Sequence, residues 1–197
     1  MSKTSAVQRL IENIRIPDIY PNQRWAQMLV KLPILTWRLG LGPITGKCVM
    51  IITHTDPKTG IPRRTVVEYH SMNGIKYVPC AFGEKSHLYR NILADPHVVI
   101  QTSHGTERMS GVRVTDPDEL ADIIAVMLRR DPPITRWYLS SLGISEIRED
   151  IKANKDRMIF LRFDPTNNPT PPALEVDLAW IWPILLIAAL LRKKRRK

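Results

Sequence analysis

The fold is decided by a stretch that reads RRTVVEYHSMNGIKYVPCAF, residues 63–82. A β-rich run over 63–70 is followed by Asn73-Gly74, and a second β-rich run covers 75–82. An Asn-Gly pair between two such runs is a strong short-range signal for a hairpin with a two-residue turn. The stretch therefore predicts two neighbouring antiparallel strands.

Further β-rich runs lie on both sides of this hairpin. Residues 48–55 precede it, and residues 97–102 and 108–114 follow it around a second turn. A last run, 157–163, closes the series. Six strands joined mainly as hairpins, with helices inserted late, predict an α+β chain built around a small six-stranded antiparallel β-barrel.

The remaining segments are expected to be helices and linkers. Residues 1–45 carry apolar side chains at helical spacing and form an N-terminal helical arm. The barrel domain covers 46–165, a proline-rich linker covers 166–177, and an apolar helix with a polybasic tail covers 178–197. Inside the barrel domain, helical segments are predicted over 83–94, 115–130, 133–142 and 145–153.

The net charge of +10 is concentrated at the C-terminal end. The last six residues, 192–197, are all Lys or Arg, which leaves +4 for the rest of the chain. Because the cations of the barrel are not interleaved with aromatic residues, no nucleic-acid partner is expected.

The basic tail follows fourteen uncharged residues, 178–191. This order predicts a segment on the cytoplasmic side of a membrane, either peripheral or tail-anchored, whose basic end is drawn to anionic lipid. A C-terminal helix packed on the core is the alternative.

Several classes of chemistry are absent from the sequence. No HExxH, CxxC, GxSxG, GxGxxG or P-loop motif occurs, and the two cysteines and five histidines show no metal-ligand spacing. No metal site is therefore expected. Hydride transfer from a bound redox cofactor needs none of these residues. The protein then has only to hold and orient two flat molecules, the cofactor and the acceptor.

Two segments carry the candidate site. Residues 58–64, KTGIPRR, place a threonine hydroxyl and three cations in a tight turn between strands, which suits a phosphate group. A solvated basic turn is the alternative. In residues 81–96, a glycine follows the end of a predicted strand, and a short predicted helix then ends at Asp-Pro.

Together the two segments resemble the deazaflavin-dependent nitroreductase family, split β-barrel proteins related to flavin-linked pyridoxamine-phosphate oxidases. That family has a G-R-K-[ST]-G-x-x-R turn between strands and a W-[YV]-x-N-[LI]-x-A-[DN]-P helix. The matching residues are Lys58, Thr59, Gly60 and Arg63 in the turn, and Tyr89, Asn91, Ile92, Ala94, Asp95 and Pro96 in the helix. The chain departs from the motifs at Asp56, Pro57 and Leu88.

The resemblance implies a split barrel of the FMN-binding type that forms a homodimer and binds coenzyme F-420, an 8-hydroxy-5-deazaflavin. It also implies hydride transfer to a quinone or nitro compound, with Tyr138 as a candidate donor to the acceptor. By the same analogy, the cofactor-binding residues are Lys58, Thr59, Arg63, Arg64, Ala81, Phe82, Gly83, Lys85, Ser86, Tyr89 and Asn91.

The departures from the motifs leave two alternatives open. Losing one cation and adding the carboxylate of Asp56 beside the phosphate weakens the attraction for an anionic cofactor. FMN is the alternative cofactor. The alternative function is a non-catalytic split-barrel subunit, or an accessory protein, of a membrane complex.

Overall fold

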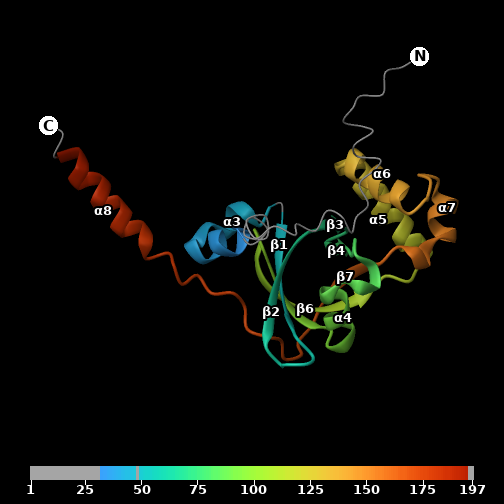
Figure 1. The fold of residues 1–197 in the computed structure, drawn as a ribbon, viewed down its shortest axis with the longest axis horizontal. Coiled ribbons are helices and arrows are strands. Elements are labelled where there is room, and N and C mark those ends of the chain that lie inside the picture. Colours follow the sequence, from blue (N-terminus) through green and yellow to red (C-terminus); the bar gives the residue numbers. More distant parts are fainter. Residues whose placement is uncertain (1–31, 48, 195–197) are drawn as a thin grey trace, which may run out of the picture.

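The computed structural model describes the backbone of residues 32–47 and 49–194, and Figure 1 shows the fold. Most of the predicted arm, residues 1–31, lies outside the described residues. Seven antiparallel strands form one sheet, so the prediction of an α+β chain is confirmed. The strands are β1 (Val49–Thr55), β2 (Pro62–Glu68), β3 (His70–Met72), β4 (Ile75–Pro79), β5 (His97–Thr102), β6 (Gly105–Arg113) and β7 (Phe160–Pro165).

The predicted number of six strands is wrong, because the run over 63–70 divides at Tyr69. The segment before Tyr69 is β2, which pairs with β1, whereas the segment after it is β3, which pairs with β4. The hairpin between β3 and β4 turns at Asn73 and Gly74, whose φ angles are 53° and 82°. Positive φ at both central residues is what a tight hairpin turn requires, and Asn-Gly supplies it.

The order of strands in the sheet is β2-β1-β5-β6-β7-β4-β3. Its two edge strands, β2 and β3, are separated in sequence by Tyr69 alone, so the sheet curls until its edges meet at this residue. The Tyr69 hydroxyl donates to the carbonyl of Gly46 at 3.3 Å, and the Tyr69 carbonyl accepts from Arg130 Nη1 at 3.0 Å. We call this position the Tyr69 corner.

Helices lie on both sides of the corner. η3 (Gly83–Lys85) and α4 (His87–Ala94) follow β4, and α4 packs on a core of β1, β5, β6 and β7 side chains. The segments α5 (Pro117–Arg130), α6 (Pro132–Ser141), α7 (Arg148–Ala153) and η4 (Lys155–Arg157) lie between β6 and β7 and supply most of a second core cluster. At the ends lie η2 (Trp37–Leu41), α3 (Gly42–Thr45) and α8 (Ile181–Lys194).

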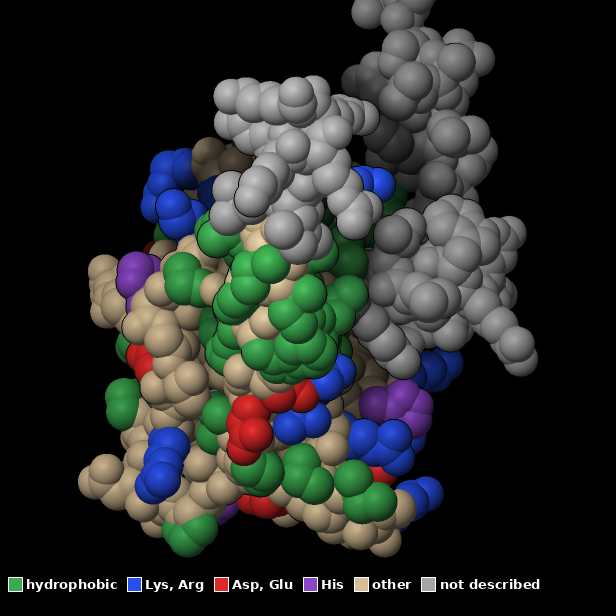
Figure 2. Space-filling model, turned by 90° about the vertical axis from the view of Figure 1, so that its left-hand side faces the viewer, with side chains coloured by type: hydrophobic (Ala, Val, Ile, Leu, Met, Phe, Trp, Pro, Cys, Tyr) green, Lys and Arg blue, Asp and Glu red, His purple; other side chains and the backbone are tan. Residues whose placement is uncertain are grey.

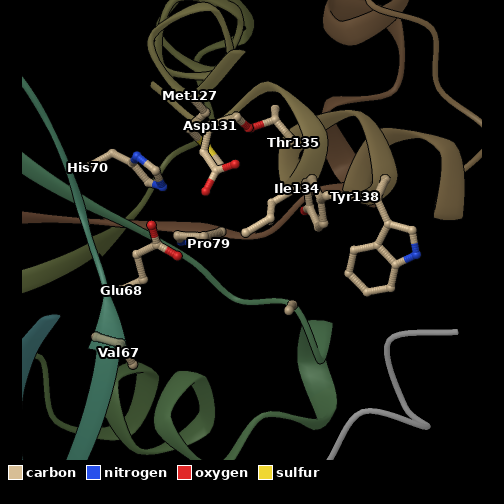
Figure 3. Close-up of a pocket in the computed structure, with 11 residues that line it drawn as sticks. Val67, Glu68, His70, Pro79, Met127, Asp131, Ile134, Thr135 and Tyr138 are labelled. Atoms are coloured by element: carbon tan, nitrogen blue, oxygen red, sulfur yellow. The ribbon is translucent and has the colours of Figure 1, made fainter. Parts of the chain in front are cut away.

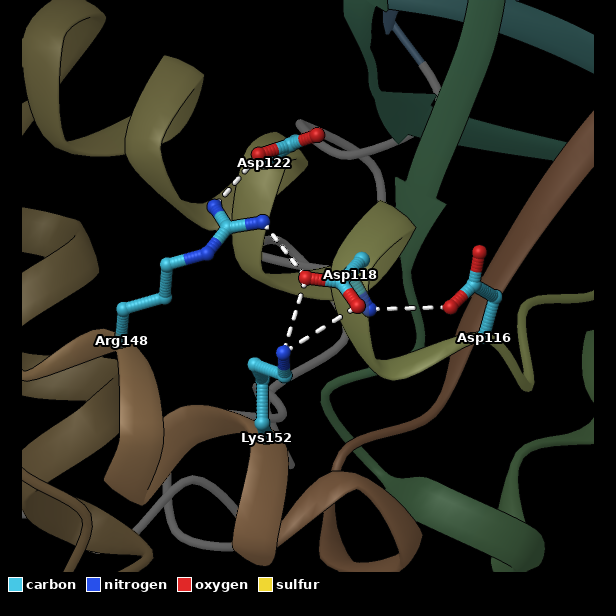
Figure 4. A network of polar contacts seen from close by, with 5 residues as sticks. All are labelled: Asp116, Asp118, Asp122, Arg148 and Lys152. Atoms are coloured by element: carbon cyan, nitrogen blue, oxygen red, sulfur yellow. Dashed lines mark hydrogen bonds and ion pairs between the residues drawn. The ribbon is translucent and has the colours of Figure 1, made fainter.

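The position of α5 is fixed at both of its ends. Asp116 caps its first turn by accepting from the Asp118 N–H at 3.0 Å, and Arg130 in its last turn reaches the Tyr69 corner. Figure 4 shows Arg148 and Lys152 of α7 bonded to acidic side chains of α5. Exposed pairs of this kind contribute little stability, but they orient α7 along α5. Since α6 begins directly after α5, it is brought beside the corner.

The linker over 166–177 is attached to the sheet by a buried amide. Gln101 Nε2 on β5 donates to the carbonyl of Leu174 at 3.0 Å, and Gln101 Oε1 accepts from the Leu174 N–H at 2.8 Å. Further along, Asp177 pairs with Arg38 at 2.6 Å. The chain then enters α8, which extends away from the body in Figure 1. Among the described helices, none has the length and hydropathy to cross a bilayer.

We expect Gln101→Leu to lower the free energy of unfolding by about 2–3 kcal/mol, because it leaves the buried N–H and C=O of Leu174 without partners. Urea unfolding measures this change. The control is Thr106→Val at the exposed register partner of Gln101, which should change stability by less than about 0.5 kcal/mol. Equal losses in the two variants would contradict the anchoring role.

Candidate functional site

A pocket of about 250 Å³ lies at the Tyr69 corner, between β2, β3, the end of β4 and the junction of α5 with α6 (Figure 3). Its wall is mainly apolar and includes Val67, Met127 and Ile134. Among the described residues, its polar lining residues are Glu68, His70, Asp131 and Thr135, and no Lys or Arg lines it. The pocket therefore suits a flat, mostly apolar molecule that bears few polar groups.

His70 is a buried ionisable residue of the pocket. Its side chain is 3% exposed, and its Nδ1 has no hydrogen-bond partner among the described residues. Burial lowers the pKa of His70, the positive charge of Arg130 lowers it further, and Asp131 opposes both effects. The imidazole is therefore neutral at pH 7 and has one ring nitrogen that donates and one that accepts.

Tyr138 and Ala81, both predicted site residues, line this pocket. The Tyr138 ring packs edge-on against Phe160, with ring centroids 6.2 Å apart. Burial raises the pKa of Tyr138 well above its ordinary value, with a smaller contribution from Cys80. Its hydroxyl is therefore protonated throughout the physiological pH range and is able to donate a hydrogen bond.

The predicted phosphate-binding turn between β1 and β2 already contains an anion of the chain. Asp56 Oδ1 accepts from the Lys58 N–H at 3.0 Å, and Asp56 Oδ2 accepts from Arg63 Nε at 3.2 Å and from Nη2 at 3.0 Å. The backbone N–H of Lys58 and the Arg63 guanidinium hold the pKa of Asp56 below its usual value. An incoming anion therefore competes with Asp56 for Arg63.

The two arginines of the turn lie on opposite faces of β2. Arg63 pairs in register with His54, whereas Arg64 pairs with Thr53. Side chains alternate along a strand, so Arg63 shares one face with Val67 and Arg64 shares the other with Glu68, and both Val67 and Glu68 line the pocket at the end of β2. At about 3.3 Å per residue, roughly 13 Å of strand separates Arg63 from Val67. Arg64 lies on the other face and is close enough to Asp177 for its charge to lower the pKa of that carboxyl.

The predicted helix-motif residues are engaged with the sheet. Asn91 Nδ2 donates to His54 Nδ1 at 3.1 Å, which leaves His54 Nε2 to donate to Thr65 Oγ1 at 3.0 Å. The hydroxyl of Tyr89 accepts from Arg113 Nη1 at 3.2 Å. Asn91 and Tyr89 thus tie α4 to β1 and β6.

The connection between β4 and α4 runs past the pocket. Ala81 lines the pocket, Phe82 is 40% exposed, and Gly83 has a φ of +56° that favours glycine. Lys85 is exposed, and Ser86 Oγ caps α4 by accepting from the Tyr89 N–H at 3.4 Å. Of this segment, Ala81 is the member that lines the pocket.

The polar residues of the pocket were not expected from the sequence. Glu68 and His70 lie some sixty positions before Asp131, and no motif joins them. In the described parts of the chain, no three His, Cys, Asp or Glu side chains are grouped to hold a metal ion.

Comparison with known proteins gives one family match. The model of a family described as F420H(2)-dependent quinone reductase matches residues 39–137, which include the turn and most of the pocket. Among curated proteins, none matches the sequence significantly.

Solved structures with a similar fold include three at low sequence identity. An F420-H2 dependent reductase has a TM-score of 0.45 and 16% identity, over 60% of this chain and 95% of that one. A Listeria innocua protein assigned as a pyridoxamine 5′-phosphate oxidase has a TM-score of 0.43 and 10% identity, over 69% and 90%. The haem storage protein HutZ from Vibrio cholerae has a TM-score of 0.44 and 14% identity, over 75% and 98%.

We expect stability to fall as the pH drops below about 6.5, because unfolded histidines then bind protons that buried His54 and His70 do not. Replacing His70 with Phe should reduce the slope of unfolding free energy against pH by up to about 1.4 kcal/mol per pH unit. This is the slope that the uptake of one proton on unfolding contributes. Urea unfolding at pH 7.5, 6.5 and 5.5 measures it, with His104→Phe at an exposed histidine as the control. If His70→Phe and wild type had the same slope, His70 would titrate normally in the folded state.

Proposed function

Because the chain belongs to the F420H(2)-dependent quinone reductase family, an oxidoreductase family whose cofactor is coenzyme F420, we propose that it transfers a hydride from the reduced coenzyme to a quinone, nitro compound or similar acceptor at a membrane surface. The proposal includes the split-barrel form of the curled sheet and a homodimer, both implied by the family resemblance.

One observation supports the proposal most directly. Arg63 and the pocket residue Val67 lie on the same face of β2, about 13 Å apart along the strand. The turn offers cations to an anionic group, whereas the pocket offers apolar walls to a flat ring. The face of β2 therefore fits the anionic tail of a coenzyme at one end and a flat, mostly apolar ring at the other.

The chemistry of the reaction is a balanced two-electron transfer. When bound, the reduced coenzyme supplies the hydride, and a quinone that takes up this hydride and one proton becomes a hydroquinone. The apolar wall of the pocket excludes water from the transfer. The Tyr138 hydroxyl, which stays protonated, stabilises the charge that develops on the acceptor oxygen.

On the coenzyme side, the tail binds at the turn. Lys58 and Arg63 supply charge, and Thr59 supplies a hydroxyl whose oxygen already accepts from the Ile61 N–H at 3.3 Å. Asp56 forms an ion pair with Arg63 and thereby limits the affinity of the turn for the coenzyme tail. Arg64, on the opposite face of β2, contributes less than the sequence motif suggests.

We expect Asp56→Asn to bind coenzyme F420 roughly fivefold more tightly, because it frees Arg63 and removes a negative charge. Asparagine keeps an oxygen for the Lys58 N–H. Arg63→Ala and Lys58→Ala should each weaken binding by about tenfold, whereas Arg64→Ala, the matched control, should change it by less than about twofold. Titration of coenzyme fluorescence measures binding, and oxidation of the reduced coenzyme by 1,2-naphthoquinone measures turnover.

The activity proposal would fail if wild-type protein bound the coenzyme but did not accelerate its oxidation. If it bound neither coenzyme F420 nor FMN and copurified with a membrane assembly, the result would favour the non-catalytic subunit. Unchanged affinity in Asp56→Asn would show that the anion binds elsewhere.

The proposed membrane site is α8 with the basic tail. Trp180, Trp182 and the residues 184–187 have exposed fractions of 45% to 62%. Figure 2 shows hydrophobic side chains gathered over this helix. The helix is tied to the body near its start, since Trp182 Nε1 donates to the Leu39 carbonyl at 2.7 Å. An apolar surface of this kind, followed by cations, suits the headgroup region of an anionic membrane on the cytoplasmic side.

We expect the protein to sediment with vesicles that contain about one third anionic lipid, and less so at high salt. Replacing Leu185 and Leu186 together with Asp should weaken vesicle binding at least tenfold, since both side chains are exposed and would otherwise lie in the lipid. The control is Ile147→Asp, at an exposed apolar residue outside α8. Equal binding of the two variants would contradict the proposed membrane site.

A further inference from the structure

We propose that the pocket at the Tyr69 corner is the acceptor site, and that His70 hydrogen-bonds the oxygen of a neutral, planar quinone bound there. This inference rests on the proposed reductase function and names the acceptor class and the residue that recognises it. Three features of the pocket support it: an unpaired buried nitrogen, the donor and acceptor capacity of that side chain, and the charge of the lining.

The first feature is the unpaired Nδ1 of His70. Buried side-chain nitrogens in folded proteins nearly always have a partner, so each exception requires an explanation. His70 is 3% exposed and lines the pocket, and Figure 3 shows its ring directed toward Asp131 and Glu68. No described residue satisfies Nδ1. Because Nδ1 is enclosed, a ligand in the pocket would become its partner through a rotation of the imidazole ring.

The second feature is that a neutral imidazole serves both forms of the acceptor. A quinone oxygen only accepts hydrogen bonds, whereas a hydroquinone hydroxyl also donates. Because a neutral imidazole has one donor and one acceptor nitrogen, and its tautomers exchange these roles, His70 is able to bond either form. Carboxylate oxygens, such as those of Glu68 and Asp131, only accept hydrogen bonds, so they cannot bond a quinone oxygen.

The third feature is the charge of the lining. Glu68 and Asp131 are the charged residues of the wall, while Arg130, which lies near His70, is directed to the Tyr69 carbonyl. An acceptor with a carboxylate or sulfonate group would meet two like charges in the pocket. A volume of about 250 Å³ with aromatic walls at Trp137 and Tyr138 suits one or two fused rings.

The binding test uses the full chain without coenzyme. Trp137 lines the pocket, so a bound quinone should quench part of the tryptophan fluorescence, and Trp137→Phe should remove that part. We expect His70→Phe to weaken 1,2-naphthoquinone binding by about tenfold, whereas His70→Gln, which donates and accepts, should retain most of it. His87→Phe, at an exposed histidine, is the matched control.

The stability of the His70→Phe variant distinguishes a role of His70 in ligand recognition from a purely structural role. If Nδ1 has no partner in the protein, His70→Phe should be as stable as wild type, or more stable, at pH 7.5. A stable His70→Phe that binds the quinone as tightly as wild type would overturn the inference. Should His70→Phe fail to fold, equal binding by His70→Ala and wild type would overturn it.

The charge test compares two acceptors, 1,2-naphthoquinone and its 4-sulfonate. Wild-type protein should bind the uncharged quinone more tightly, and replacing Glu68 with Gln together with Asp131 with Asn should reduce this preference about tenfold. Asp131 does not cap α6 through its side chain, and Glu68 is exposed, so the double variant leaves the fold intact. An unchanged preference would overturn the charge argument.

Failure of this inference is distinguishable from failure of the proposed function. If wild type binds naphthoquinone through His70 but never oxidises reduced coenzyme F420, the acceptor site stands and the reductase function fails. If turnover occurs with equal KM for the quinone in wild type and His70→Phe, the function stands and the acceptor site lies elsewhere.

Discussion

The structure depends on the closure of the sheet at Tyr69. The first and last strands of the sheet, β2 and β3, are successive parts of one stretch of chain, so the sheet has no freedom to open without breaking contacts on both sides of this residue. Tyr69 is buried, its hydroxyl is bonded to Gly46, and its carbonyl is bonded to Arg130. One residue thus joins the C-cap of α3, the sheet and the end of α5.

This closure also creates the pocket. Because the chain changes direction at Tyr69, Glu68 and His70 approach the same space from two different strands. Arg130 holds the end of α5 at the corner, and the chain continues through Asp131 into α6, which supplies the aromatic wall. The elements that meet at this corner bury His70, and none of their described residues bonds its Nδ1.

Local signals in the sequence were sufficient for most of the strands and helices. The Asn73-Gly74 turn and the Asp116 cap are determined by neighbouring residues, and both are present in the structure. The division at Tyr69 was missed because the two halves of the run form separate hairpins, with β1 before it and β4 after it, and no turn residue within the run marks where one pairing ends and the other begins. Ala81 and Tyr138, both predicted site residues, line the same pocket, whereas Asp131 and His70 carry no motif.

The basic turn shows why charge counted along a sequence differs from charge available to a ligand. Arg63 and Arg64 are adjacent, yet the alternation of a strand places them on opposite faces, and Asp56 binds Arg63. The turn therefore presents less positive charge to the pocket face than its composition indicates, while the pocket itself carries two carboxylates. Along β2, the cationic Arg63 and the acidic Glu68 are five residues, or roughly 17 Å, apart. In the proposed reductase, this polarity would direct an anionic coenzyme tail to the turn and a neutral acceptor to the pocket. With α8 at a membrane surface, as proposed, the protein would meet acceptors of that neutral kind in the lipid.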